Sequence, residues 1–130
     1  MAHIILKKDL PLPPDRTWSY LTNPDLLAEW LFPTDFKAEE AFQFSFKVSS
    51  HHKITGEVLT LTEPVNLAVS WNMPGYPRTT YVWWKTSRKG AGCLLELEHS
   101  GLTGLRGWLK RGKIRKNWKK RLEKLRRCME

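Results

Sequence analysis

The chain has 130 residues, of which 41% are hydrophobic and 27% are charged, the balance of a globular protein. Seven Trp, five Phe and three Tyr are too many aromatic residues for a disordered chain. This length suits one ordinary domain and excludes a second full one, so we expect residues 1–130 to form a single domain.

The cysteine content and the hydropathy limit the class of protein further. Cys93 and Cys128 form no Cys-x-x-Cys pair, which argues against a disulfide framework and a thiolate zinc site. No apolar run approaches the roughly 18–20 residues that span a bilayer, and the N-terminus lacks the apolar core of a signal peptide. We therefore expect a soluble, unprocessed cytoplasmic protein with no membrane span, no metal and no cofactor.

The net charge of +9 is confined to the C-terminal part of the chain. Residues 103–130 contain 12 Lys and Arg against 2 Glu, whereas residues 1–102 contain 10 basic and 11 acidic residues. Any partner that is recognised through positive charge is therefore expected at the C-terminal segment.

A strand and two short helices are predicted at the N-terminus. The strand covers residues 3–9 and ends at the proline-rich segment 10–14, because prolines at this density interrupt a strand. The end of that segment suits a first helical turn, and residues 15–21 are the first predicted helix. Asn23 is a predicted N-cap and Pro24 the first residue of the second helix.

Apolar and polar side chains alternate over residues 42–48, which predicts a half-buried strand. Similar runs predict four more strands, over residues 53–61, 66–72, 79–86 and 93–100. Short links between these strands favour antiparallel hairpins. The connection over residues 73–77 is longer and stiffer, and we expect it to overhang an opening.

The last predicted element is a helix from about Lys113, after an irregular stretch with four glycines in residues 101–112. An apolar stripe along this helix has 4-4-3-4 spacing and consists of Ile114, Trp118, Leu122, Leu125 and Met129. A strand, two helices, a strand meander and one long helix predict an α+β fold whose antiparallel sheet curls around the final helix.

Four motifs occur in order along the chain: Trp18-Ser19-Tyr20-Leu21-Thr22-Asn23-Pro24 with Leu27 and Trp30, Gly56-Glu57-Val58 through Trp71, Cys93-Leu94-Leu95-Glu96-Leu97-Glu98-His99-Ser100-Gly101, and Trp118 with Leu122 and Leu125. Together they resemble the heat-shock protein 90 ATPase activator homologue family, a branch of the START-like (SRPBCC) helix-grip domains. The similarity covers nearly the whole chain, and the order of the four motifs makes it specific for the fold.

The resemblance implies a curved antiparallel sheet around a long C-terminal helix, with a cavity that in related branches holds lipids, sterols, hormones or polyketide intermediates. It implies no shared activity, because the family name comes from a domain of a eukaryotic co-chaperone. Two departures from the family pattern stand out: Ala41-Phe42 replaces a frequent Gly-Gly, and Cys93 replaces Thr. Phe42 has the same parity as Phe44, so we expect it to point inward and narrow one end of the cavity.

Strand parity and the resemblance together give the candidate ligand-binding residues. The candidates are Trp30, Phe42, Phe44, Phe46, Val58, Trp71, Trp84, Leu95, Leu97, His99, Trp118 and Leu122. Val48, Val69 and Val82 are predicted on the same inward face of the sheet, while Glu96 and Glu98 face water. Two interpretations stay open, because these side chains could either line a pocket or fill a packed core.

His99 is the main polar candidate, since it shares the inward face at the end of a predicted strand. A structural histidine with satisfied hydrogen bonds is the expected role, and a general acid or base is the alternative. His51 and His52 point to opposite faces of a strand and cannot chelate one metal ion together. No catalytic motif is present, so we expect no catalytic residue and no metal ligand.

The basic C-terminal helix has two interpretations. Lys and Arg are favourable near a helix C-terminus and aid solubility. Like-charge pairs at i,i+4 each cost about 0.2–0.5 kcal/mol, however, and an anionic partner would offset that cost. Nucleic acid, an acidic membrane surface and an acidic protein all qualify as that partner. The residues available for a weak polyanion contact are Lys113, Arg115, Lys116, Lys119, Lys120 and Arg121.

The function that we expect first is non-catalytic binding of a small apolar or aromatic ligand between the sheet and the C-terminal helix. One alternative is a protein-interaction module, either co-chaperone-like or polyanion-binding through the basic helix. The other is an enzyme of the cyclase or hydrolase type that uses His99.

Overall fold

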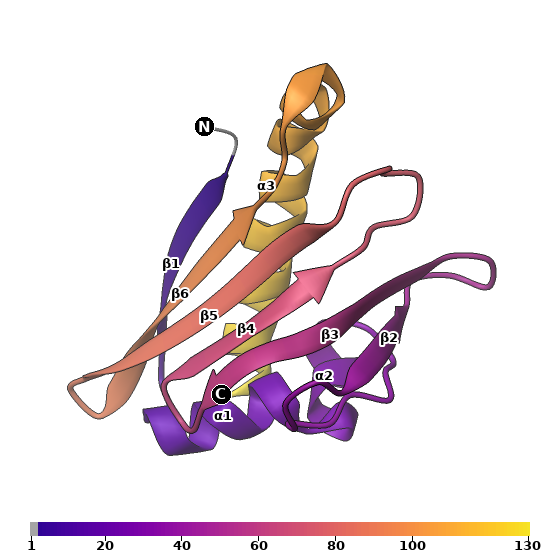
Figure 1. Ribbon diagram of the computed structural model, residues 1–130. Helices are drawn as coiled ribbons and strands as arrows, with labels where there is room; N and C mark the ends of the chain where they lie inside the picture. The colour runs from indigo at the N-terminus through magenta and orange to yellow at the C-terminus, as the bar shows by residue number, and fades with distance from the viewer. Residues whose placement is uncertain (1–2) are drawn as a thin grey trace.

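The computed structural model describes residues 3–130 as a curved six-stranded antiparallel sheet and three helices (Figure 1), which confirms the predicted α+β helix-grip fold. The elements in chain order are β1 (Ile4–Leu10), α1 (Pro14–Thr22), α2 (Pro24–Trp30), β2 (Gln43–Lys47), β3 (Lys53–Thr62), β4 (Asn66–Trp71), β5 (Thr80–Lys89), β6 (Gly92–Ser100) and α3 (Gly104–Cys128).

The strand order in the sheet is β1-β6-β5-β4-β3-β2. Strands β2 to β6 are successive antiparallel neighbours, as their short links predicted, and β1 pairs with β6 at the far edge. Figure 1 shows α3 lying across one face of the sheet, with α1 and α2 at the end of the sheet where α3 finishes. The face of the sheet toward α3 and the apolar side of α3 therefore bury each other.

The two short helices begin as the sequence predicted. Pro14 and Pro24 occupy first-turn positions, where the missing N–H breaks no helical hydrogen bond. Asn23 is the N-cap of α2, and its side-chain Oδ1 accepts hydrogen bonds from the backbone N–H of Asp25 at 2.9 Å and of Leu26 at 3.3 Å. These bonds fix the direction in which the chain leaves α1 and enters α2. Helix α2 lies next to α3.

Helix α3 starts at Gly104 and not near Lys113, so the prediction of an irregular stretch before Lys113 is wrong. Glycine lowers helix propensity by about 1 kcal/mol, but packing outweighs that cost in this helix. Gly107 is buried, and a Cβ atom at this position would collide with the Leu102 carbonyl and the Tyr76 hydroxyl. This glycine therefore permits close contact between the start of α3 and the adjoining loops.

The predicted stripe of α3 packs on the sheet. Trp118, Leu122, Leu125 and Met129 are buried, and Ile114 is partly buried. Most of the predicted inward positions of the strands are buried as well, and they include Phe44, Phe46, Val69, Trp71, Val82, Trp84, Leu95 and Leu97. Val48, just beyond the end of β2, is 40% exposed.

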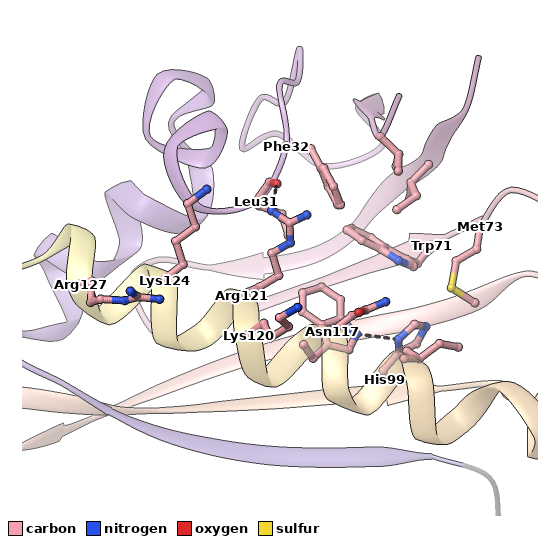
Figure 2. Close-up of a pocket in the computed structure, with 14 residues that line it drawn as sticks. Leu31, Phe32, Trp71, Met73, His99, Asn117, Lys120, Arg121, Lys124 and Arg127 are labelled. Carbon is pink, nitrogen blue, oxygen red and sulfur yellow. Dashed lines mark hydrogen bonds between the residues drawn. The ribbon is translucent and has the colours of Figure 1, made fainter. Parts of the chain in front are cut away.

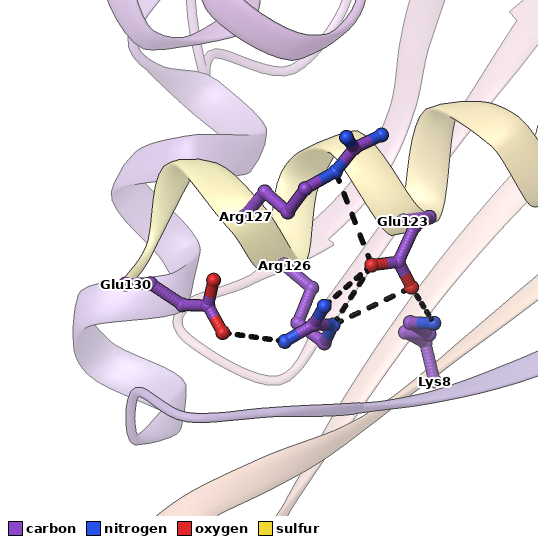
Figure 3. Close-up of polar contacts among 5 residues, drawn as sticks. All are labelled: Lys8, Glu123, Arg126, Arg127 and Glu130. Atoms are coloured by element: carbon purple, nitrogen blue, oxygen red, sulfur yellow. Dashed lines mark hydrogen bonds and ion pairs between the residues drawn. The ribbon is translucent and has the colours of Figure 1, made fainter.

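An ion-pair network fixes α3 to the edge strand of the sheet (Figure 3). Lys8 of β1 donates to Glu123 Oε1 at 2.7 Å, and Arg126 donates to both carboxylate oxygens of Glu123 and to Glu130. Hydrogen bonds from Arg126 and Lys8 lower the pKa of Glu123 to about 2. Glu123 thus stays ionised and joins two elements that are far apart in the sequence.

Candidate functional site

A pocket of about 520 Å³ lies between α3, the concave face of the sheet and the loop after α2 (Figure 2). Its lining residues come from five parts of the chain: Leu31, Phe32, Val48, Ile54, Trp71, Met73, His99, Ile114, Asn117, Trp118, Lys120, Arg121, Lys124 and Arg127. The pocket therefore occupies the position between sheet and C-terminal helix that the helix-grip fold predicts for a ligand.

The pocket has an apolar floor and a basic mouth. Leu31, Ile54, Trp71 and Trp118 are almost fully buried and form the floor. The exposed lining residues mark the mouth, and they are Val48, Asn117, Lys120, Lys124 and Arg127. Buried aromatic rings and exposed basic side chains thus line the same pocket.

The aromatic residues of the floor are held by packing with their neighbours. The Trp118 ring centre lies 5.6 Å from that of Trp71 and 5.4 Å from that of Trp84, the latter edge-to-face. Trp84 in turn meets Trp30 edge-to-face at 5.7 Å. Such contacts are favourable geometries for aromatic pairs and keep the floor in one shape.

Arg121 connects the mouth of the pocket to the end of α2. Its Nη1 group donates to the Leu31 carbonyl at 2.8 Å, and its guanidinium carbon lies 4.3 Å from the centre of the Phe32 ring, as Figure 2 shows. Burial lowers the pKa of Arg121, although a guanidinium remains charged in proteins. This side chain brings a positive charge to an otherwise apolar wall.

His99 lines the pocket but is fully buried, and both of its ring nitrogens have partners. Trp118 Nε1 donates to His99 Nδ1 at 3.0 Å, so Nδ1 carries no proton, because an indole nitrogen can only donate. The proton on Nε2 is then donated to Thr80 Oγ1 at 2.8 Å, and Thr80 donates to the Trp71 carbonyl at 2.6 Å. Burial lowers the pKa of His99 to about 4 and keeps the ring neutral.

These contacts favour the structural interpretation of His99 over the catalytic one. A general base needs a ring nitrogen that can reach a substrate proton, and neither nitrogen of His99 is available for that. No carboxylate lines the pocket, and within residues 3–130 no cluster of three or more His, Cys, Asp or Glu could hold a metal ion.

The connection between β4 and β5 contributes one residue to the pocket, and its expected position over an opening stays a prediction. Met73 lines the pocket, and the buried Tyr76 donates its hydroxyl proton to the Thr103 carbonyl at 3.2 Å. Arg78 of the same connection donates to the Thr103 hydroxyl at 3.1 Å. This loop is therefore attached to the residue that precedes α3.

Three of the twelve candidate ligand-binding residues line the pocket: Trp71, His99 and Trp118. Eight others lie in the packed core, namely Trp30, Phe44, Phe46, Val58, Trp84, Leu95, Leu97 and Leu122, and Phe42 packs partly buried against it. Ligand contact by the three lining residues stays a prediction.

Several lining residues were not among the candidates. The sequence places Ile114 only in the apolar stripe and Arg121 only in the basic helix. Leu31, Phe32 and Met73 belong to loops, for which neither helical nor strand periodicity gives an inward direction. The connection over residues 73–77, which we expect to overhang an opening, is the signal in the sequence that points to Met73.

Comparison with known proteins agrees with this geometry. The profile of the family described as "Activator of Hsp90 ATPase homolog 1-like protein" matches residues 11–130. The chain belongs to this family. It is thereby a START-like helix-grip domain, a class whose members generally bind small hydrophobic ligands.

Solved structures of the same fold come from several bacteria. Protein MLL2253 from Mesorhizobium loti has a TM-score of 0.89 at 25% identity, with 96% of this chain and 94% of that chain covered. CalU16 from Micromonospora echinospora has a TM-score of 0.82 at 26% identity, with 95% and 71% covered. Protein BH1534 from Bacillus halodurans, at 20% identity, has a TM-score of 0.83, with 100% and 98% covered.

No curated protein matches this sequence significantly. In the part of the chain that the structure describes, no helix combines the length and the hydropathy needed to cross a membrane.

Proposed function

We propose that this chain binds one small, mainly apolar ligand in the pocket between the sheet and α3. The observation that carries the proposal is the buried floor of Ile54, Trp71 and Trp118 beneath a mouth open to solvent. The volume of about 520 Å³ lies within the range of about 300–1,000 Å³ that is usual for small-molecule sites. A ligand that covers this floor removes apolar surface from water, which is the main source of its affinity.

The aromatic rings of the site favour a flat or aromatic ligand. Trp71, Trp118 and Phe32 present three rings to the same pocket. Aromatic pairs gain about 0.5–1.5 kcal/mol beyond the burial of their area. The hydrogen bonds of His99 hold Trp118 in place, so the site is formed before a ligand enters.

The experiment is a titration with N-phenyl-1-naphthylamine, an uncharged apolar probe whose fluorescence rises in apolar surroundings. We expect a stoichiometry near one and a change in tryptophan emission from Trp71 and Trp118. Ile114→Trp places a larger side chain in the pocket and should weaken binding about tenfold. Ile5→Trp is the matched control, because Ile5 is 46% exposed and does not line the pocket.

Native mass spectrometry of protein taken directly from cells is the second measurement. A small molecule retained by the wild-type chain and absent from the Ile114→Trp variant would identify the ligand. If the folded wild-type protein takes up no probe, or if both Trp variants bind it equally well, the pocket is not the binding site and the proposal is wrong.

A further inference from the structure

The basic mouth of the pocket narrows the class of ligand, an inference that rests on the proposed function. Four lining residues carry positive charge, Lys120, Arg121, Lys124 and Arg127, and all of them lie on α3. No Asp or Glu lines the pocket. Binding of a neutral apolar ligand would leave four like charges around its exposed end.

Three of these charges have no acidic partner among residues 3–130. Lys120, Arg121 and Lys124 form no ion pair with any of residues 3–130. Arg127 lies 4.0 Å from Glu123, whose carboxylate already binds Lys8 and Arg126. The mouth of the pocket therefore carries positive charge that no acidic side chain of residues 3–130 neutralises.

Arg121 is the residue best placed to bind an anion. Its guanidinium is partly buried between α3 and Phe32, and a hydrogen bond to the Leu31 carbonyl fixes its position. That bond uses one of the five N–H donors of the side chain. An acidic group at the mouth would bind the remaining donors and would offset the burial of this cation.

We infer that the ligand is amphipathic, with an apolar or aromatic body against Trp71 and Trp118 and an acidic group paired with Arg121. A carboxylate and a sulfonate share this chemistry. Lys120 and Lys124 flank Arg121 on the same helix and add attraction at longer range.

Two ligands that differ only in the head group test the inference. Decanoate and decan-1-ol have the same chain length, and each is used to displace N-phenyl-1-naphthylamine. We expect decanoate to bind about tenfold more tightly than decan-1-ol at low salt. Arg121→Gln and Lys124→Gln should reduce this preference, while Lys119→Gln, an exposed change outside the pocket, should keep it.

The outcomes separate this inference from the proposed function. Equal affinity for the acid and the alcohol, in a protein that binds the probe, would overturn the inference that the ligand has an acidic group. The proposed apolar pocket would remain. Unchanged preference in both Gln variants would also overturn it. Failure of the probe itself to bind would instead contradict the proposed function.

A second inference rests on a different surface, the first turns of α3 over residues 104–113, termed here the helix tip. Leu105, Leu109 and Trp108 are 73%, 66% and 63% exposed, the highest values among the large hydrophobic residues that the structure describes. At about 100° per residue they share one side of the helix, away from the buried Gly107. Figure 1 shows the helix tip reaching beyond the ends of the strands.

The surroundings of this apolar side are strongly basic. Arg106, Lys110, Arg111, Lys113 and Arg115 lie on the helix tip or directly after it, and the sequence has no acidic residue between Glu98 and Glu123. A second copy of the chain on this surface would bring like charges together, whereas an anionic lipid surface is complementary to it. Trp beside Leu and basic residues is typical of helices that lie in the lipid interface.

We propose that the helix tip docks on an anionic membrane surface through Leu105, Trp108 and Leu109. The test is cosedimentation with phosphatidylcholine vesicles that contain about 30 mol% phosphatidylglycerol, compared with pure phosphatidylcholine. We expect binding to the anionic vesicles to be about tenfold tighter and to weaken with salt. The double variant Trp108→Gln, Leu109→Gln should lose it, while Leu59→Gln, an exposed site on β3, should not.

Three results would overturn the docking proposal. The first is absence of the wild-type chain from the pellet of anionic vesicles, and the second is binding of the double variant as tight as that of the wild type. A dimer in solution that the double variant dissociates would assign the same side chains to a second copy of the chain.

Discussion

The indole N–H of Trp118 and Nδ1 of His99 form a buried hydrogen bond of 3.0 Å between the middle of α3 and the end of β6. The bond requires the neutral ring with its proton on Nε2, and Nε2 donates that proton in a hydrogen bond to Thr80 Oγ1. A protonated His99 would turn Nδ1 into a donor that faces another donor. This hydrogen bond between α3 and the sheet therefore depends on pH.

The first prediction is a loss of stability between pH 6.5 and pH 4. The pKa of His99 is lowered by burial from 6.5 to about 4, so only the unfolded chain takes up a proton in this window. Stability is complete above the higher value, and the free energy of unfolding should fall by about 3 kcal/mol as the pH reaches the lower one. Urea unfolding at a series of pH values measures this change.

A control separates His99 from the carboxylate of Glu123. The pKa of Glu123 is lowered from 4.5 to about 2, so its contribution is lost only as the pH falls through that lower window. His99→Gln should be less stable than the wild type near neutral pH and should show no drop between pH 6.5 and 4.5. A drop of the same size in this variant would contradict the assignment.

The second prediction concerns the apolar stripe of α3. Leu122 is 2% exposed and packs on the sheet, so Leu122→Asp should lower the free energy of unfolding by about 4 kcal/mol, because it buries an unpaired carboxylate. Lys119→Asp introduces the same side chain at an exposed position of the same helix and should change stability by less than about 0.5 kcal/mol. Equal thermal midpoints for the two variants would be incompatible with the packing of α3.

The third prediction concerns Ala41, which adopts a φ of 66° in the left-handed region. Left-handed backbone costs a residue with a Cβ atom about 1–2 kcal/mol, so Ala41→Gly should stabilise the protein by about 1 kcal/mol. Ala38→Gly, an exposed change outside the left-handed region, should instead cost a few tenths of a kcal/mol or more. Chemical denaturation measures the free energy of unfolding of both variants. A lower value for Ala41→Gly than for the wild type would contradict the strain at Ala41.

Strand periodicity predicted the sheet well, because each strand buries one face. Trp71 of β4, Trp84 of β5 and Leu97 of β6 all lie at the alternate positions predicted to face inward, and all three are buried. It could not separate core from pocket. Trp71 and Trp84 have the same inward direction, yet only Trp71 lines the pocket, because the Trp30 ring packs edge-to-face against Trp84. That distinction depends on contacts between elements distant in the sequence.

The start of α3 could not be predicted for a related reason. Gly107 lowers the local helix propensity, and its advantage becomes visible only when Leu102 and Tyr76 are placed against it. With the helix assigned from Lys113 onward, the exposed apolar side of the helix tip was also missed. The basic character of the helix, by contrast, could be read directly from composition.

The fourth prediction concerns duplex DNA, which tests whether the basic helix acts as a general polyanion site. Lys113, Lys116 and Lys119 are exposed and lie outside the pocket. Binding through such side chains releases counterions, so the affinity should fall with salt at a log–log slope of roughly −0.9 per phosphate contacted. We expect weak binding without sequence preference, with a Kd near the non-specific range of about 10⁻⁴–10⁻⁶ M.

Reversal of the three charges to Glu should abolish DNA binding and leave uptake of N-phenyl-1-naphthylamine unchanged, because none of the three side chains reaches the pocket floor. Fluorescence anisotropy of labelled DNA at several salt concentrations measures the slope and the affinity together. A salt-resistant complex that prefers one sequence would mean that base contacts exist, since phosphate contacts alone carry no sequence information. Such a complex would make the basic helix a specific nucleic-acid site, and the pocket would then be the secondary feature of the molecule.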